Sequence, residues 1–551
     1  MATLKPHVSS LGYALFLTVN ATAIWGGIFP FLPPEFQTDE LTLTFYLAQA
    51  LAFSGAFLAS MLGSYFFPHK ARRMLVTLSA LLVFAGSACP IGAMYLFDYT
   101  LALVASGGIL LGIGCAGMFM LWQRYFASLP PKEGSLRLII GTAVAPLIYF
   151  TLYLVPIAVT AFLIPLVFVP LCALCMSLSV REMQIDQPMF EDIPRQHPSV
   201  YRHAISDHWR NALCVGAIAF ASGVFRGIAL LHEEISTTVN IASMLGSLVS
   251  AAVLLVLWYR FSFRFSLATV FRIAYPLLLT GFVLLPFLGA EYLNLFAALM
   301  YMAFSFILML MMMQSAQVSR DRGINPVFIY AFFGSVAYLM QSLGFLLGWL
   351  SDSATGFGSI FGDNWLYVVA GISEYVIGLT LLAASGTLFK ELPGRKAAAA
   401  EPIEFLGGGH AARTSADPPH AASAPSAKPA KSKVRRNRPS SSGADGKLRD
   451  RFSKLCQQTQ LAYGLSMREA EVMELIARGH SVASIAEKLF ISENTVRTHS
   501  KHIYTKLDIH SKQELLDLLD SLDEGSAVGE DAPDGEQRST RDIARNEHPE
   551  T

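Results

Sequence analysis

Residues 464–507 read GLSMREAEVMELIARGHSVASIAEKLFISENTVRTHSKHIYTKL, and this stretch contains three helix starts. Ser466 can cap a first helix, and Glu469, three residues later, completes a capping box. Ser481 and Ser492 stand at the corresponding positions before a second and a third apolar pattern. The spacing therefore predicts three short helices, with a fourth following them.

The third helix has two chemically distinct faces. Its predicted inner face consists of Val496, Ile503 and Leu507. These residues are spaced seven and four apart, so they should pack on the first two helices. The outward face then carries Arg497, Thr498 and Lys501, at positions i, i+1 and i+4, with Asn494 and Thr505 beside them. A helix with this face can enter the major groove of a DNA duplex.

The stretch resembles the LuxR-type (GerE-type) helix-turn-helix of bacterial transcription regulators. The matching motifs are Leu465-Ser466-x-Arg468-Glu469, Ile491-Ser492-x-x-Thr495-Val496-Arg497-x-His499 and Ile503-Tyr504-x-Lys506-Leu507. The resemblance implies that Arg497, Thr498 and Lys501 meet base edges. It also implies phosphate contacts by Thr495, His499, Lys506, Ser511 and Lys512. The fourth helix, Ser511 to Leu519, would supply the dimer face that many members use.

Charge and composition divide the chain around this domain. We predict a membrane module at 1–388, a disordered basic linker at 389–454, the helix-turn-helix domain at 455–521 and an acidic disordered tail at 522–551. The linker is rich in Ala, Pro and Ser and cannot bury enough apolar surface to fold. Its basic cluster could bind anionic lipid headgroups or DNA phosphates, or could remain a solvated charge run. That cluster comprises Lys428, Lys431, Lys433, Arg435, Arg436 and Arg438.

Apolar composition predicts the membrane module. The whole chain of 551 residues is 53% hydrophobic and 15% charged, which is a low charge content for a soluble protein. About 20 apolar residues are needed to cross a bilayer as a helix. The predicted spans are 11–32, 44–67, 74–97, 100–122, 138–159, 160–180, 213–231, 238–260, 265–288, 293–315, 327–350 and 365–388. The fold class is therefore all-α, with a twelve-helix bundle joined to a small four-helix domain.

The loops between these spans predict the orientation of the module. Alternate loops carry all of the Lys and Arg residues, including Arg181, Arg195 and Arg320, and such loops stay in the cytoplasm. The other loops carry acidic residues, such as Asp98 and Glu291, and no Lys or Arg. We expect a multi-pass protein of the inner (cytoplasmic) membrane, with both termini and the helix-turn-helix domain in the cytoplasm.

The longest cytoplasmic connection, about 181–212, divides the module into six plus six spans. This layout resembles the major facilitator superfamily, whose two halves enclose a central substrate site. The loop after the second span keeps a Gly at 63 and a basic group at Lys70, Arg72 and Arg73. It lacks the Asp that is typical of that superfamily's loop, which favours a sensor over a transporter.

Two ionisable residues stand out well inside predicted spans. Arg226 falls in the seventh span and Glu374 in the twelfth, and such groups at membrane depth often mark functional sites. Either residue could face a central cavity and bind a charged ligand. Alternatively, they pair with each other or with backbone carbonyls and only hold the spans together.

Two functions remain open from these patterns. The first is a membrane-anchored transcription regulator whose membrane module senses a small molecule or a membrane state. The second is a secondary transporter with a DNA-binding regulatory tail. No phosphate-binding loop, zinc-protease motif or nucleophile elbow stands in a convincing setting. We therefore expect no enzymatic activity, no cofactor and no metal, with duplex DNA, the bilayer, a small ligand and a second copy as partners.

Overall fold

A computed structural model describes residues 7–22, 38–71, 75–183, 187–196, 198–231, 233–260, 263–265, 267–351, 356–385, 403–405, 451–478, 482–489, 491–512, 514–516 and 518–519. The chain forms two compact units, Met1–Leu448 and Arg449–Thr551. Each unit has its own cluster of buried apolar side chains. The two units are therefore described separately.

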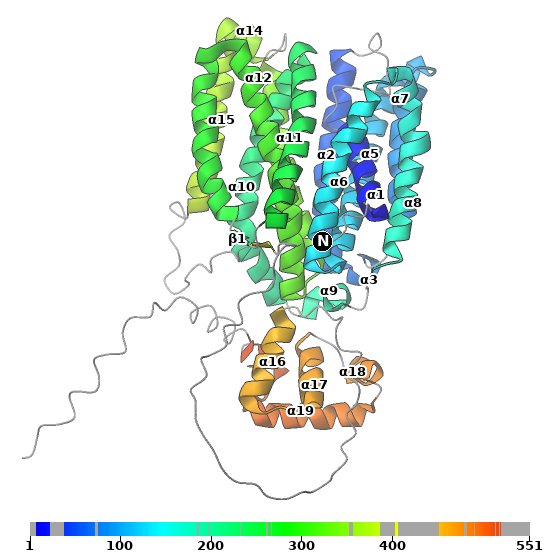
Figure 1. The fold of residues 1–551 in the computed structure, drawn as a ribbon, viewed down its shortest axis with the longest axis vertical. Coiled ribbons are helices and arrows are strands. Elements are labelled where there is room, and N and C mark those ends of the chain that lie inside the picture. Colours follow the sequence, from blue (N-terminus) through cyan, green and yellow to red (C-terminus); the bar gives the residue numbers. More distant parts are fainter. Residues whose placement is uncertain are drawn as a thin grey trace, which may run out of the picture. The chain divides into compact units, whose positions relative to one another are not determined.

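The first unit is a bundle of long apolar helices (Figure 1). Its first half contains α1 (Val8–Asn20), α2 (Asp39–Phe66), α3 (Pro68–Ala71), α4 (Val76–Ala93), α5 (Thr100–Ser128), α6 (Pro131–Leu152), α7 (Ile157–Leu163) and α8 (Val169–Val180). After the short α9 (Pro188–Glu191), the second half contains α10 (Pro198–Leu231), α11 (Glu233–Arg260), α12 (Leu267–Arg322), α13 (Pro326–Ser351), α14 (Phe357–Phe361) and α15 (Trp365–Ser385). One π-helical stretch, Ile164–Phe168, joins α7 to α8.

The twelve predicted spans correspond to this bundle. Ten helices among the described residues are long and apolar enough to cross a bilayer. Two shorter apolar helices, Val8–Asn20 and Ala274–Leu288, fall at the predicted first and ninth spans. Residues 23–32 of the predicted first span lie outside the described residues. The length and composition of the helices make this chain a multi-pass membrane protein.

Helix α12 accounts for two predicted spans because its chain doubles back. The rings of Phe282 and Phe296 lie 5.2 Å apart, and the Tyr292 hydroxyl donates to the Gly281 carbonyl at 3.1 Å. Fourteen residues of straight helix would separate the two Phe residues by about 21 Å along the axis. The chain must therefore reverse between them, as two separate spans require.

The predicted basic loops gather at one end of the bundle. Figure 1 shows α3, α9 and the strand β1 (Phe263–Phe265) at one end, and α14 at the other. Strand β1 pairs antiparallel with β2 (Ile403–Phe405). Residues 403–405 belong to the segment predicted to be a disordered linker, so that prediction does not hold for these three residues. Composition could not reveal a strand partner 140 residues away in sequence.

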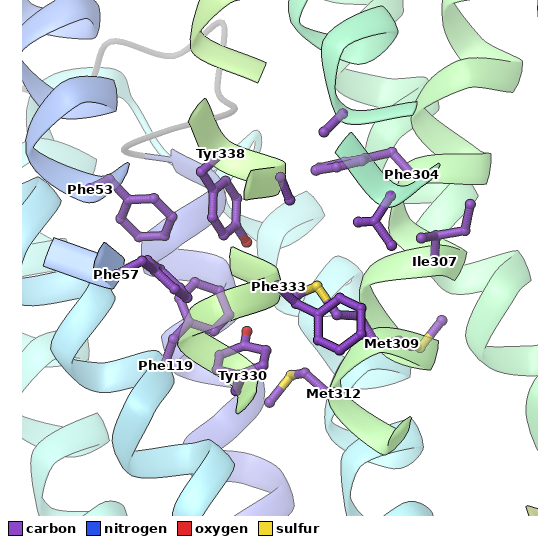
Figure 2. Close-up of a cluster of buried hydrophobic side chains, with 14 of the residues drawn as sticks. Phe53, Phe57, Phe119, Phe304, Ile307, Met309, Met312, Tyr330, Phe333 and Tyr338 are labelled. Carbon is purple, nitrogen blue, oxygen red and sulfur yellow. The ribbon is translucent and has the colours of Figure 1, made fainter. Parts of the chain in front are cut away.

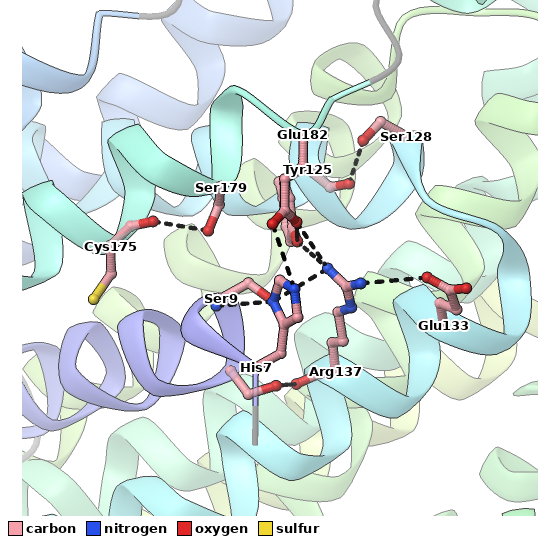
Figure 3. Close-up of polar contacts among 10 residues, drawn as sticks. His7, Ser9, Tyr125, Ser128, Glu133, Arg137, Cys175, Ser179 and Glu182 are labelled. Atoms are coloured by element: carbon pink, nitrogen blue, oxygen red, sulfur yellow. Dashed lines mark hydrogen bonds and ion pairs between the residues drawn. The ribbon is translucent and has the colours of Figure 1, made fainter. Parts of the chain in front are cut away.

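A network of polar side chains joins several segments of the first half near this end. The Arg137 guanidinium contacts Glu133 and Glu182 at 3.3 Å each, and it donates to the Tyr125 hydroxyl. Figure 3 shows His7 beside these groups, with its Nε2 atom 3.4 Å from the Glu182 carboxylate. The network joins α1, α5, α6 and the turn after α8, so it fixes four chain segments to one another.

The two halves of the bundle meet through aromatic residues. Helix α2 packs against α13, and α6 packs against α11. Figure 2 shows Phe53 and Phe57 of α2 beside Tyr330 and Tyr338 of α13. The rings of Phe53 and Tyr338 lie 4.5 Å apart in an edge-to-face arrangement, which favours close packing of the pair.

Helices α10 and α13 approach each other most closely through glycines. A methyl group added at Gly223 would overlap the Gln341 carbonyl, and one added at Gly348 would overlap the Val224 carbonyl. Gly227 and Gly344 are similarly crowded by the opposite backbone. Each helix thus carries a Gly-x-x-x-Gly motif, which lets two helix backbones touch inside a membrane. We call these four residues the glycine seam.

The second unit is a small helical domain. It contains α16 (Arg451–Tyr463), α17 (Met467–Ala477), α18 (Val482–Leu489), α19 (Glu493–Leu507) and further helical residues between Ser511 and Leu519. Within this unit, Figure 1 shows α19 running across the ends of α16 and α17. Helix α16 lies before the first predicted helix and was not predicted. Its Leu455 and Cys456 are buried in the core of the unit.

Candidate nucleic-acid interface

Local hydrogen bonds start two helices of the second unit as the sequence predicts. The Ser466 hydroxyl accepts from the backbone N–H of Glu469, and the Glu469 carboxylate accepts from the backbone N–H of Ser466. This capping box satisfies N–H groups that have no partner within the helix. The Ser492 hydroxyl accepts from the backbone N–H of Thr495 at 3.1 Å and starts α19. Ser481, the predicted cap of the second helix, lies outside the described residues.

The inner face of α19 is buried as predicted. Val496 and Ile503 have no exposed surface, and Leu507 is 4% exposed. They join Val472, Met473 and Ile485 from α17 and α18 in one apolar cluster. Because this face is fixed in the core, the orientation of the opposite face is fixed as well.

The opposite face of α19 presents a stripe of exposed polar residues. We call this stripe the outer face of α19, and its members are Asn494, Arg497, Thr498, Lys501 and Thr505. The Thr498 hydroxyl donates to the Asn494 carbonyl, and the Thr505 hydroxyl donates to the Lys501 carbonyl, each at 2.9 Å. Their methyl groups are then directed away from those carbonyls. The outer face therefore offers cations, one amide and methyl groups, which are the groups that read base edges.

One acidic residue lies beside this outer face. The Arg497 guanidinium is 3.3 Å from the Glu493 carboxylate one turn earlier, and both side chains are more than half exposed. An exposed i, i+4 pair of this kind contributes little free energy. Arg497 can therefore leave Glu493 for another anion at small cost.

Lys506 is bound to the rest of the domain more firmly than the sequence suggests, although its side chain is 39% exposed. Its ammonium lies 2.7 Å from the Glu469 carboxylate and 3.3 Å from the Gly464 carbonyl. The Glu469 side chain is only 7% exposed. The hydrogen bond from Lys506, followed by the one from the Ser466 backbone, lowers the pKa of Glu469 to about 2. Lys506 therefore joins α19 to α17, a role that the predicted phosphate contact did not include.

The remaining predicted phosphate contacts have varied surroundings. The Thr495 hydroxyl lies 2.8 Å from that of Ser492, and His499 is half-buried. The Ser511 hydroxyl accepts from the backbone N–H of Glu514 and caps the last helical stretch. Lys512 is half-buried, and this burial lowers its pKa.

An open groove connects Lys512 to the outer face of α19. Arg497, Lys501 and Lys512 line this groove, together with Thr505, His510 and one acidic residue, Asp508. Three cationic side chains from two segments are thereby placed along one surface. Phosphate contacts in protein–DNA complexes are made by such groups, and they set the register of the protein on the duplex.

The two residues predicted to bind a ligand in the membrane module lie apart. Arg226 is 5% exposed on α10, and it lines a cavity whose described lining does not include Glu374. Glu374 is half-buried on α15 and forms no ion pair with Arg226 in the described structure. Arg226 instead donates to the Asn240 side chain at 3.3 Å. The pairing of Arg226 with Glu374 that the sequence left open is therefore not formed.

Residues 464–519 match the family of bacterial regulatory proteins described as the luxR family. These residues are 55% identical over 53 positions to the oxygen regulatory protein NreC of Staphylococcus haemolyticus, and 53% identical to NreC of Staphylococcus epidermidis. The matched segment is 10% of this chain and 24% of each relative. The chain therefore spans about a quarter of the length of the curated relatives that it matches. Residues 464–519 are a LuxR-type helix-turn-helix domain.

Two of the solved structures to which the chain is similar are membrane transporters. A bacterial homologue of the iron transporter ferroportin is 11% identical, with a TM-score of 0.46, and covers 70% of this chain and 99% of its own. The major facilitator superfamily proton:xylose symporter XylE is 14% identical, with a TM-score of 0.40, and covers 72% of this chain and 97% of its own.

Proposed function

We propose that this chain is a membrane-anchored transcription regulator that reads duplex DNA with α19. The observation that supports this function best is the outer face of α19, which is exposed on a LuxR-type domain, while ten described helices of the same chain are long and apolar enough to cross a membrane. Arg497, Thr498 and Lys501 would contact base edges. Thr495, His499, Lys506, Ser511 and Lys512 would lie near phosphates.

The surroundings of these residues indicate which of the proposed contacts should contribute most to DNA affinity. Arg497 and Lys501 are exposed, so they can approach the duplex without breaking a buried interaction. Lys506 is already bound to Glu469, and Ser511 to Glu514, so their contribution to affinity should be smaller. A bidentate arginine contact to guanine discriminates against other bases by about 1–3 kcal/mol.

The membrane module would hold this domain on the cytoplasmic side of the inner membrane. The basic loops at one end of the bundle support that orientation, because Lys and Arg remain in the cytoplasm. A ligand in the module would change regulation only if it bound two conformations with different affinity. The change in conformation would alter how two copies of the chain associate in the membrane. Association would bring two α19 helices together and so raise their effective concentration at one operator.

Selection from genomic DNA tests the proposal and identifies the operator in the same experiment. The full chain in nanodiscs is mixed with sheared genomic fragments, and the bound fragments are sequenced. We expect enrichment of a small set of sites sharing a motif. Arg497→Ala should weaken binding to an enriched duplex by about tenfold or more and relax the motif at one position. Rising salt should weaken the wild-type chain steeply.

Arg468→Ala is the matched control for this experiment. The Arg468 side chain is 50% exposed, pairs with Glu471 on α17 and donates to the Leu489 carbonyl at 3.5 Å, and it does not belong to the outer face of α19. Its removal changes the net charge by the same amount, so it should affect affinity much less than Arg497→Ala. Equal loss in both variants, or no enriched sites with the wild-type chain, would contradict sequence reading by α19.

A further inference from the structure

The groove beside α19 gathers more positive charge than the domain around it. Its lining includes Arg497, Lys501 and Lys512 and one carboxylate, that of Asp508. Residues 451–521 as a whole contain nine basic and nine acidic residues. The groove is therefore a positive surface on a domain without net charge, and such a surface attracts an acidic partner.

The cations of this groove can accept an additional anion. Lys501 is exposed, and neither Lys501 nor Lys512 forms an ion pair with a carboxylate among the described residues. Lys512 is half-buried, and this burial lowers its pKa. A nearby anion would oppose that shift, because it favours the charged ammonium. Arg497 pairs with Glu493 at the surface, where the pair is weak.

The chain supplies an acidic segment directly after this domain. Residues 522–536 contain six Asp or Glu residues and no Lys or Arg. Residues 537–551 contain three acidic residues and three arginines, so their formal charges cancel. The excess negative charge of the C-terminal tail therefore lies entirely in its first half. We call residues 522–536 the acidic segment.

The acidic segment is long enough to reach the groove. Lys512 precedes Leu519 by seven residues, which corresponds to about 10 Å along a helix. The eleven residues from Leu519 to Glu530 can span up to about 38 Å when extended, so they can return past Lys512 to α19. A short tether gives an effective concentration in the millimolar range, at which even weak ion pairing is populated.

From these observations we infer that the acidic segment binds in the groove and covers the outer face of α19. Its carboxylates would pair with Arg497, Lys501 and Lys512, to which the proposed function assigns contacts with the duplex. This inference rests on the proposed function, because duplex DNA is the ligand with which the segment would compete. The duplex must then displace the segment before it binds, which lowers the affinity of the chain for every duplex by the same factor.

Binding of a labelled duplex of random sequence to the full chain in nanodiscs tests this competition. The test variant neutralises three carboxylates of the acidic segment, through Glu530→Gln, Asp531→Asn and Asp534→Asn. We expect it to bind the duplex about threefold or more tightly than the wild-type chain, because three ion pairs are lost although each is weak. The gain should shrink as salt rises, since salt screens exposed charges.

The matched control neutralises three carboxylates in the second half of the tail, through Asp542→Asn, Glu547→Gln and Glu550→Gln. It changes the net charge by the same amount, so a general reduction in the repulsion of DNA would appear in both variants. We expect a smaller gain in duplex affinity from the control than from the test variant. Equal gains, or no gain in the test variant, would overturn the inference.

Cross-linking without DNA locates the acidic segment directly. A carbodiimide joins a lysine to a carboxylate that contacts it, and mass spectrometry identifies the joined peptides. In nanodiscs that hold one chain, we expect Lys501 to be joined to carboxylates of the acidic segment in preference to those of residues 537–551. Absence of this cross-link, or equal cross-linking to both halves of the tail, would also overturn the inference.

The two measurements separate this inference from the proposed function. If the wild-type chain binds the duplex but Lys501 is not joined to the acidic segment, docking of the segment is wrong and the proposed function stands. If the cross-link forms but no variant binds any duplex, docking of the segment stands and the proposed function fails.

Discussion

At the scale of single residues, Glu469 takes part both in a helix cap and in an ion pair. It accepts from the Ser466 backbone and from Lys506, so one carboxylate holds the start of α17 against α19. The capping box could be predicted because its two members are three residues apart. The contact with Lys506 could not, because 37 residues separate the partners and only the packed fold brings them together.

Lys506→Ala should therefore lower stability more than a surface mutation does. Removing the ammonium leaves a buried carboxylate with one partner fewer, at a cost of about 1–3 kcal/mol. The measurement is urea unfolding of a 449–523 fragment, which contains the whole apolar core of the second unit. Lys501→Ala serves as the control, because Lys501 is exposed on the same helix. A stability equal to that of Lys501→Ala would show that the ion pair contributes nothing.

The same carboxylate predicts a pH dependence. The folded pKa of Glu469, about 2, is below its ordinary value of 4.5, so its ionised form stabilises the folded state. This contribution is complete above pH 4.5 and disappears as the pH falls toward 2. We expect the free energy of unfolding of the 449–523 fragment to fall over that interval. Glu469→Gln should flatten the fall, and an unchanged pH profile in that variant would contradict the assignment.

At the scale of helices, capping residues and apolar spacing predicted where a helix starts and which of its faces is buried. They did not predict which other helix it contacts. Ser492 and the apolar spacing of α19 specified its cap and buried side, and both are confirmed. Helix α16 was missed because more than half of its residues are polar and it follows a polar linker, although Asp450, a residue type that can cap a helix, directly precedes it. The glycine seam was also missed, because a single Gly-x-x-x-Gly motif does not identify the helix that it meets. The cavity around Arg226 depends on three helices whose contacts are all long-range.

Helix α16 should be required for stability of the helix-turn-helix. The luxR-family match begins at residue 464, yet Leu455 and Cys456 of α16 are buried in the core. A fragment of residues 464–523 would expose the surface that these side chains cover. We expect its thermal unfolding midpoint to lie several degrees below that of the 449–523 fragment. Circular dichroism measures the difference, and equal midpoints would show that α16 is dispensable.

The glycine seam predicts a position-specific effect of a single methyl group. Gly227→Ala would place a methyl group against the backbone of α13, so the two helices would have to separate. We expect poor recovery of folded protein or a lower thermal midpoint in detergent. Gly371→Ala on α15 is the matched control, since nothing lies within 4 Å of the added carbon there. Equal behaviour of the two variants would contradict close packing at the seam.

For the whole molecule, the proposed orientation can be read with a membrane-impermeant thiol reagent. Asp98→Cys lies in a predicted outer loop and Arg195→Cys in a predicted inner one, and both positions are exposed. In a background without the six native cysteines, intact cells should label the first and not the second. Permeabilised cells should label both. Labelling of Arg195→Cys in intact cells would place the basic loops outside and refute the cytoplasmic DNA-binding domain.

Touching backbones along α10 and α13 have a mechanical consequence for signalling. The two backbones are in contact at four glycines, so a displacement of one helix along the other would bring neighbouring side chains against the opposite backbone, and we expect the two helices to shift as a single body. Arg226 and Phe345 both belong to this pair of helices, whereas Gln49 belongs to α2. A change in the space between these three residues would therefore change the position of the first half of the bundle relative to the second.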